Sequence, residues 1–265
     1  KLYRAGKKAF DLFESGIHEI HKIPEDYKLS EHQQIQKDCA VSGKPFIAKE
    51  AIKHFLKTLK YPLYYLDFET YNTAVPLYDG VKPYQQIPFQ FSLHIVDSEK
   101  TKSKHVSFLA SGDKDPRKEF IKILKASIAD DGTIVAYNDS FEKRILKEVG
   151  DAFPEYKKWI DTAIDRMVDL LDPFRGFMYY NPKQKGSASL KEVLPALTGK
   201  DYSGMEIAEG GMASLRYLFI THGSFDGKKA TQEEVKQVRE ALEKYCCLDT
   251  EGMVWIVDEL NKLIK

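Results

Sequence analysis

The chain has 265 residues, of which 43% are hydrophobic and 30% are charged, and its formal net charge at pH 7 is zero. This composition is typical of a folded globular protein and excludes a disordered chain. The zero net charge argues against tight nonspecific binding of nucleic acid, but not against an enzyme that grips a few nucleotides. No apolar run approaches the roughly 20 residues that cross a bilayer.

The N-terminal residues 1–6 lack the apolar stretch of a signal peptide. The three cysteines, Cys39, Cys246 and Cys247, show no zinc-ligand spacing and suit a reducing compartment. We therefore expect a cytoplasmic protein without a membrane partner and without structural zinc. Because the chain does not begin with Met, we also expect it to be a piece of a larger protein with further domains.

Residues 1–60 are expected to form a helical N-terminal segment, a linker or remnant of that larger protein. Pro62 ends the helical pattern, and we place the second domain at residues 61–265. Apolar spacing, together with Ser30 as an N-cap, predicts three helices in the first segment, over residues 7–14, 31–41 and 48–59.

The second domain alternates strand and helix patterns. Four apolar or alternating runs predict strands, over residues 61–69, 89–96, 105–109 and 133–137. Longer periodic segments predict helices or helical pieces, over residues 115–129, 139–149, 155–182, 189–197, 205–222 and 232–264. This order indicates an α/β fold with a mixed sheet flanked by helices.

Asp67 and Glu69 stand at the end of the first predicted strand. Alternate strand residues point to one face, so the two carboxylates project together. Neighbouring carboxylates repel one another, and a hard divalent cation such as Mg²⁺ or Mn²⁺ removes that cost. The alternative is that both acids are solvated at a strand end.

Two further groups of polar residues follow. Asn138 and Glu142 lie where a predicted strand runs into a helix, which suits an N-cap followed by an acid in the first turn. Tyr245 and Asp249 are spaced by four residues, so they share one face of the last predicted helix. Taken singly, each group is explained by ordinary helix structure.

In this order, the three groups resemble the motifs of the DnaQ-like, or DEDD, exonuclease superfamily, which has a ribonuclease H-like fold. Asp67 and Glu69 match its Asp-x-Glu motif, and Tyr245 and Asp249 match the Tyr-x-x-x-Asp motif of its DEDDy branch. Asn138, Phe141 and Glu142 match its second motif, but with Glu where the superfamily has Asp. Asp139 is a nearby substitute, three residues from the expected position.

The resemblance implies a 3′–5′ exonuclease that hydrolyses the phosphodiester bonds of DNA or RNA with two Mg²⁺ or Mn²⁺ ions. Asp67, Glu69, Glu142 and Asp249 would hold the metals, and Tyr245 would orient the attacking water. The partner would be a nucleic acid with a free 3′ end, expected to be single-stranded.

Other residues are expected to contact the substrate: Asn138, Phe68, Thr70, Tyr84 and Lys191. Tyr84 lies in a loop after the first motif and is placed to stack on a base, with a self-packed surface loop as the alternative. Asp169 is expected to support the site, and a helix-end acid is the equally weighted alternative. His94 is interpreted as an ordinary sheet residue.

Residues 61–70 and 83–94 are also similar to an uncharacterised bacterial domain family. Its members are regarded as nucleases and often form the C-terminal half of larger proteins. Two alternatives to an exonuclease remain: a catalytically weak or inactive ribonuclease H-like module that binds nucleic acid or a partner, and a structural domain with solvated acids.

Overall fold

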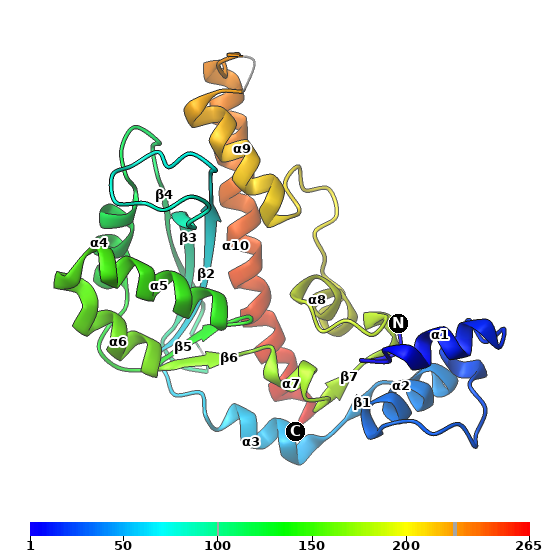
Figure 1. The fold of residues 1–265 in the computed structure, drawn as a ribbon. Helices are drawn as coiled ribbons and strands as arrows, with labels where there is room; N and C mark the ends of the chain where they lie inside the picture. Colours follow the sequence, from blue (N-terminus) through cyan, green and yellow to red (C-terminus); the bar gives the residue numbers. More distant parts are fainter. Residues whose placement is uncertain (100, 225–226) are drawn as a thin grey trace. The chain divides into compact units, whose positions relative to one another are not determined.

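A computed structural model describes residues 1–99, 101–224 and 227–265 (Figure 1). The chain divides into two compact units. The first combines Lys1–Thr58, Leu171–Asp201 and Trp255–Lys265, and the second combines Leu59–Leu170 and Tyr202–Val254. The first boundary lies close to the expected one, but residues 171–201 and 255–265, which we placed in the second domain, group instead with the N-terminal segment.

The first unit is mostly helical. Ser30 caps α2 as predicted: its hydroxyl accepts a hydrogen bond from the Gln33 N–H, and the Gln33 side chain accepts one from the Ser30 N–H. Its elements are α1 (Lys7–Glu14), η1 (Ile20–Lys22), α2 (Glu31–Ser42), β1 (Phe46–Ile47), α3 (Lys49–Leu56), α7 (Asp172–Arg175), β7 (Tyr179–Tyr180), η3 (Pro182–Gln184) and α8 (Leu190–Thr198).

Long-range contacts explain why residues 171–201 belong to this unit. β1 pairs antiparallel with β7, so that Phe46 lies opposite Tyr180. The buried Gln36 side chain donates to the Tyr180 hydroxyl over 3.3 Å and accepts from the Tyr3 N–H over 2.6 Å. Because these contacts join residues far apart in sequence, local periodicity carries no sign of them.

The second unit is built on a five-stranded mixed sheet with the order β4-β3-β2-β5-β6. β2 pairs antiparallel with β3, and β3 with β4, whereas β5 runs parallel to β2 and β6 parallel to β5. The carboxyl ends of β2, β5 and β6 therefore meet at one edge. The strands are β2 (Leu63–Tyr71), β3 (Ile87–Val96), β4 (Lys104–Leu109), β5 (Thr133–Ala136) and β6 (Met167–Asp169).

Helices cover both faces of this sheet (Figure 1). On one face Phe68 and Phe91 pack edge-on against Phe120 of α4, at 4.9 and 5.6 Å between ring centroids. On the other face the Gln90 amide donates to the Leu242 carbonyl of α10 over 2.9 Å. The helical elements are α4 (Arg117–Ser127), α5 (Ser140–Ala152), η2 (Pro154–Tyr156), α6 (Lys157–Asp165), α9 (Gly210–His222) and α10 (Gln232–Leu263), the last of which continues into the first unit.

The α/β class with a mixed sheet is confirmed, and most expected elements are found within a few residues. Three short strands escaped prediction because two or three residues show no alternation: β1, β6 and β7. The helix expected over 205–222 begins only at Gly210. Ile207 is fully buried in the core, so the apolar character of this stretch reflects packing of a non-helical segment.

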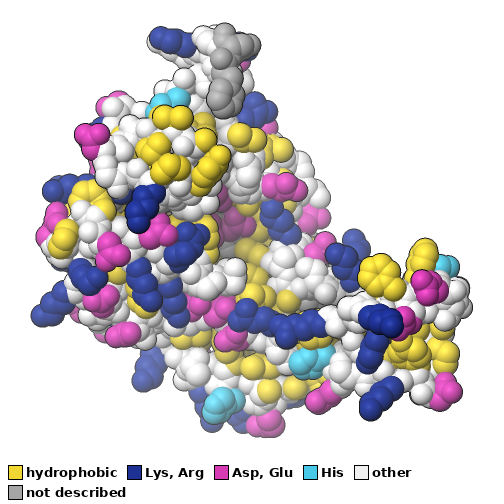
Figure 2. Space-filling view, in the orientation of Figure 1, with side chains coloured by type: hydrophobic (Ala, Val, Ile, Leu, Met, Phe, Trp, Pro, Cys, Tyr) yellow, Lys and Arg dark blue, Asp and Glu magenta, His cyan; other side chains and the backbone are white. Residues whose placement is uncertain are grey.

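Within the described residues, no helix is both long enough and apolar enough to cross a membrane. Figure 2 shows basic and acidic side chains interspersed over the visible face, in keeping with the zero net charge.

Candidate metal site

Asp67 and Glu69 lie near the carboxyl end of β2, the central strand of the second unit. They occupy alternate positions and so share a face, opposite to that of Phe68. Glu69 is buried and Asp67 half-buried. The register with β3 shifts directly after Glu69, which places a bulge beside the pair, and bulges of this kind re-aim neighbouring side chains.

α10 brings Asp249 to the same place. One carboxylate oxygen from each of Asp67, Glu69 and Asp249 lies within 4.8 Å of the others. Asp249 is buried, as is Tyr245 one turn earlier on the same helix. Two of the three predicted motifs are therefore brought together, although they come from opposite ends of the second unit.

The environment of Asp67 opposes its ionisation. Burial raises the pKa of Asp67 well above its usual range, and the charges of Asp249 and Glu69 raise it further. The Cys246 thiol, whose Sγ lies 3.6 Å from Asp67 Oδ2, opposes this pKa shift by donating a weak hydrogen bond. Carboxyl groups so arranged must hold protons or share a cation.

Glu142 lies in the first turn of α5 and is 3% exposed. It is outside the group of three carboxylates within 4.8 Å, yet its charge still raises the pKa of Asp67. Burial raises the pKa of Glu142 itself to about 8, with smaller contributions from Asp139 and Asp169. Its Oε2 atom is buried without a hydrogen-bond partner. A bound proton or a nearby cation would compensate for this missing hydrogen bond.

Asn138 and Asp169 support the strand ends beside Glu142. Asn138 was expected to cap α5, but the N-cap is Asp139, and Asn138 precedes it in the left-handed region with φ 67°. In that conformation the Asn138 N–H donates to Asp169 Oδ1 over 2.8 Å. Asp169 ends β6, opposite Ala136, and thus links the two parallel strands that precede the site.

Asp139 is not a free substitute for Glu142, because it forms an ion pair of 2.5 Å with Lys143. Phe68 is a core residue, so any contact of this residue with a ligand would come from its backbone. Thr70 is buried and donates to Gln86 Oε1 over 2.8 Å. Tyr84 is 68% exposed in its loop.

Lys191, the remaining predicted contact, belongs to the first unit, in the first turn of α8. The predicted site residues of the second unit that surround the carboxylates come from β2, β6, α5, α10 and the turn between β5 and α5.

Sequence patterns gave no sign of Tyr202. Its hydroxyl donates a hydrogen bond to Asp249 Oδ1, and its ring lies 6.2 Å from that of Tyr245, between centroids. Burial and the Asp249 charge raise the pKa of Tyr202, so it remains a donor. Burial, Asp249 and Glu69 likewise raise the pKa of Tyr245. Neither phenol can serve as a base near neutral pH.

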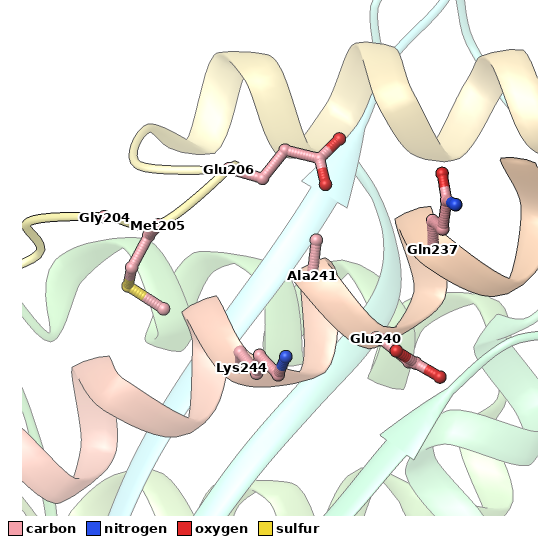
Figure 3. A pocket seen from close by; sticks show the side chains of 7 residues that line it. All are labelled: Gly204, Met205, Glu206, Gln237, Glu240, Ala241 and Lys244. Carbon is pink, nitrogen blue, oxygen red and sulfur yellow. The ribbon is translucent and has the colours of Figure 1, made fainter.

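A separate pocket of about 260 Å³ lies between the segment that follows Tyr202 and the α10 turns that precede Tyr245 (Figure 3). Its charged side chains are Glu206, Glu240 and Lys244. None of the predicted metal ligands lines it, so the chemistry suggested by the carboxylates belongs to the strand edge.

Comparison with known proteins places the chain beside sequences of unassigned activity. Residues 64–189 match the family described as "Domain of unknown function (DUF2779)", in agreement with the predicted similarity to an uncharacterised domain family. The chain is 28% identical over 251 residues to "Uncharacterized protein MG366" of Mycoplasma genitalium, covering 84% of this chain and 36% of that protein.

It is also 28% identical over 223 residues to the homologue of that protein in Mycoplasma pneumoniae, covering 77% of this chain and 33% of the relative. "Uncharacterized protein UU173" of Ureaplasma parvum is 30% identical over 160 residues, which cover 57% of this chain and 23% of that protein. The chain thus spans about a third of the length of the two Mycoplasma relatives. No solved structure matches it.

Proposed function

We propose that the second unit is a divalent-metal-dependent phosphodiesterase, acting as a 3′–5′ exonuclease on DNA or RNA, with a ribonuclease H-like fold. The observation that carries the proposal is the convergence of Asp67, Glu69 and Asp249 within 4.8 Å. Such a group is costly to bury in its ionised form, and a divalent cation shared by the three carboxylates would offset that cost.

The donor set fits Mg²⁺ or Mn²⁺. All of its atoms are carboxylate oxygens, the ligands that these hard ions prefer. The buried Oε2 of Glu142 has no hydrogen-bond partner, which a nearby cation would correct. Asp67, Glu69 and Asp249 would hold the metal, with Glu142 as a further acid at the edge. When bound, the metal supplies an activated water and stabilises the leaving oxygen.

The surrounding residues have distinct tasks in this proposal. Tyr202 fixes the orientation of Asp249 through its hydrogen bond. Tyr245, held protonated, donates a hydrogen bond that orients water or a phosphate oxygen. Asp169 holds the Asn138 backbone and thereby the start of α5, which carries Glu142.

The direction of cleavage and the nucleic-acid substrate rest on the resemblance of the three motifs. Two observations support it. The order along the sequence is that of the superfamily motifs for Asp67, Glu69, Glu142, Tyr245 and Asp249, and the first motif lies on the central strand of a mixed sheet.

The test is Mn²⁺-dependent degradation of single-stranded DNA and RNA labelled at either end. Wild-type protein should shorten the strands from the 3′ end, and Asp67→Ala should be inactive. Asp161→Ala, an exposed acid of α6, serves as the matched control and should keep full activity. Equal degradation by Asp67→Ala, or none by the wild type on any strand, would contradict the proposal. Mn²⁺ binding without degradation would favour the inactive binding module.

A further inference from the structure

A second group of metal-ligating side chains lies elsewhere in the second unit, on β3, β4 and α10. His94 and His105 are register partners across these two strands, with ring centroids 4.6 Å apart. Cys247 approaches them from α10. One ligand atom from each of the three residues lies within 4.8 Å of the others. The group combines two imidazoles and a thiol, which differs in kind from the all-carboxylate group.

One arrangement of the hydrogen atoms satisfies every hydrogen bond around the two histidines. The Thr250 hydroxyl lies 3.1 Å from the Cys247 carbonyl, 2.6 Å from Ser92 Oγ and 2.7 Å from His94 Nδ1. A carbonyl only accepts, so all three contacts are made together if the single hydroxyl hydrogen of Thr250 goes to it. In that arrangement Ser92 and His94 Nδ1 both donate to Thr250.

The same logic extends to the second ring. Ser92 Oγ also lies 2.8 Å from His105 Nε2. In this arrangement the only hydroxyl hydrogen of Ser92 is directed to Thr250, and His105 Nε2 donates to Ser92. The arrangement leaves one lone pair on each ring, at Nε2 of His94 and at Nδ1 of His105.

We propose that His94, His105 and Cys247 form a second metal site, for a borderline divalent transition ion such as Zn²⁺, with one coordination position left open. Two imidazole nitrogens and a thiolate suit such an ion and not Mg²⁺. Metal ligands at about 2.0–2.3 Å from an ion lie roughly 3–4 Å from one another. The ligand atoms must therefore move slightly closer together than the observed spacing. The side chains of His105 and Cys247 have room for this movement, because His105 is exposed and Cys247 is half-buried.

The surroundings favour this site in two further ways. Hydrogen bonds from the second nitrogen of each ring orient metal-binding histidines, and the buried Ser92 and Thr250 supply them here. Burial, and then His105, lower the pKa of His94 to about 4, so its ring is neutral near neutral pH. Sequence spacing gave no sign of the site because its ligands come from three separate elements.

The site is independent of the proposed nuclease activity, and it has a structural consequence. Cys247 lies two residues before Asp249 on α10. An occupied site would hold this turn of the helix against the β3–β4 pair.

The test uses Co²⁺ alone as the probe, added to the metal-free chain of 265 residues. We expect one equivalent to give the charge-transfer absorption of a cobalt–thiolate bond, to be displaced by Zn²⁺ and to resist excess Mg²⁺. Cys247→Ser should abolish this absorption, and His105→Ala should weaken Co²⁺ binding at least tenfold. Cys39→Ser, in the first unit, is the matched control and should bind as the wild type does.

Cys246→Ser separates this site from the carboxylates, since the Cys246 thiol contacts Asp67. Absorption that survives in Cys247→Ser but is lost in Cys246→Ser would assign the metal to the carboxylate group and overturn the proposal. Absence of any thiolate absorption in the wild type would overturn it equally. A far-ultraviolet circular dichroism spectrum equal to that of the wild type shows that each variant is folded.

Discussion

Glu142 should make the metal-free protein less stable as the pH rises. In the unfolded chain its carboxyl ionises near the ordinary pKa of 4.5, whereas burial raises the pKa in the folded state to about 8. Between these values the folded protein holds a proton that the unfolded chain has released. The contribution to stability is therefore complete below about pH 4.5 and is lost as the pH rises to about 8. At about 1.4 kcal/mol per pH unit, the free energy of unfolding falls by up to about 5 kcal/mol.

Urea unfolding in the presence of a chelator, from about pH 5 to about pH 9, measures this loss. Glu142→Gln keeps the shape of the side chain but removes its ionisation. Above about pH 8 the variant should exceed the wild type in free energy of unfolding by up to about 5 kcal/mol. Glu119→Gln, an exposed acid of α4, is the control and should follow the wild type.

Addition of Mn²⁺ should reverse much of the loss in the wild type. A ligand at a hundred times its dissociation constant stabilises the folded state by about 2.7 kcal/mol. Identical pH profiles for wild type and Glu142→Gln would refute the reasoning, because Glu142 would then ionise in the folded protein as it does in water.

Three further predictions concern neighbouring residues and the other unit. Asp67→Asn should stabilise the metal-free protein near neutral pH, because it removes a buried carboxyl that ionises freely only in the unfolded chain. It should also abolish Mn²⁺-dependent stabilisation in thermal melts, and retained Mn²⁺ stabilisation would contradict the site. Tyr202→Phe removes the hydrogen bond that orients Asp249, so it should weaken Mn²⁺ affinity roughly ten- to a hundredfold in a titration of the melting midpoint. Tyr84→Phe, at an exposed residue, should not change this affinity. Equal affinities for wild type and Tyr202→Phe would show that Tyr202 has no role in the site. Ser30→Ala should lower the free energy of unfolding by about 1 kcal/mol in urea titrations and leave Mn²⁺ affinity unchanged; an unchanged stability would show that the capping box of α2 contributes nothing.

Local periodicity accounts for what the sequence could predict. Asp67 and Glu69 share a face because strand residues alternate, and Tyr245 and Asp249 share one because helix residues repeat every three to four positions. Both patterns depend only on residues that are close together in the sequence. The convergence of Asp67, Glu69 and Asp249 was expected from the resemblance alone, and in the structure one carboxylate oxygen of each lies within 4.8 Å of the others.

Residues that act through distant contacts were out of reach. Tyr202 lies in a segment without periodicity and gains its role only by meeting Asp249. Asn138 was expected to cap a helix because of its residue type, yet its backbone N–H donates a hydrogen bond to Asp169. Asp169 lies on β6, which has too few residues to show a strand pattern in the sequence. The grouping of residues 171–201 with the N-terminal segment likewise depends on a partner strand far away in sequence.

The hydrogen bonds between β3 and α10 have a mechanical consequence. The Gln90 amide holds the Leu242 carbonyl, and Ser92 with His94 holds the Thr250 hydroxyl. These two anchor points lie on either side of Tyr245 and Asp249 along the helix. Sliding α10 by even one residue would break both anchors at once and leave buried polar groups unpaired. The two sets of hydrogen bonds therefore fix the position of α10 along its own axis. Tyr245 and Asp249, which lie between them, keep a fixed position relative to the strand that carries Asp67.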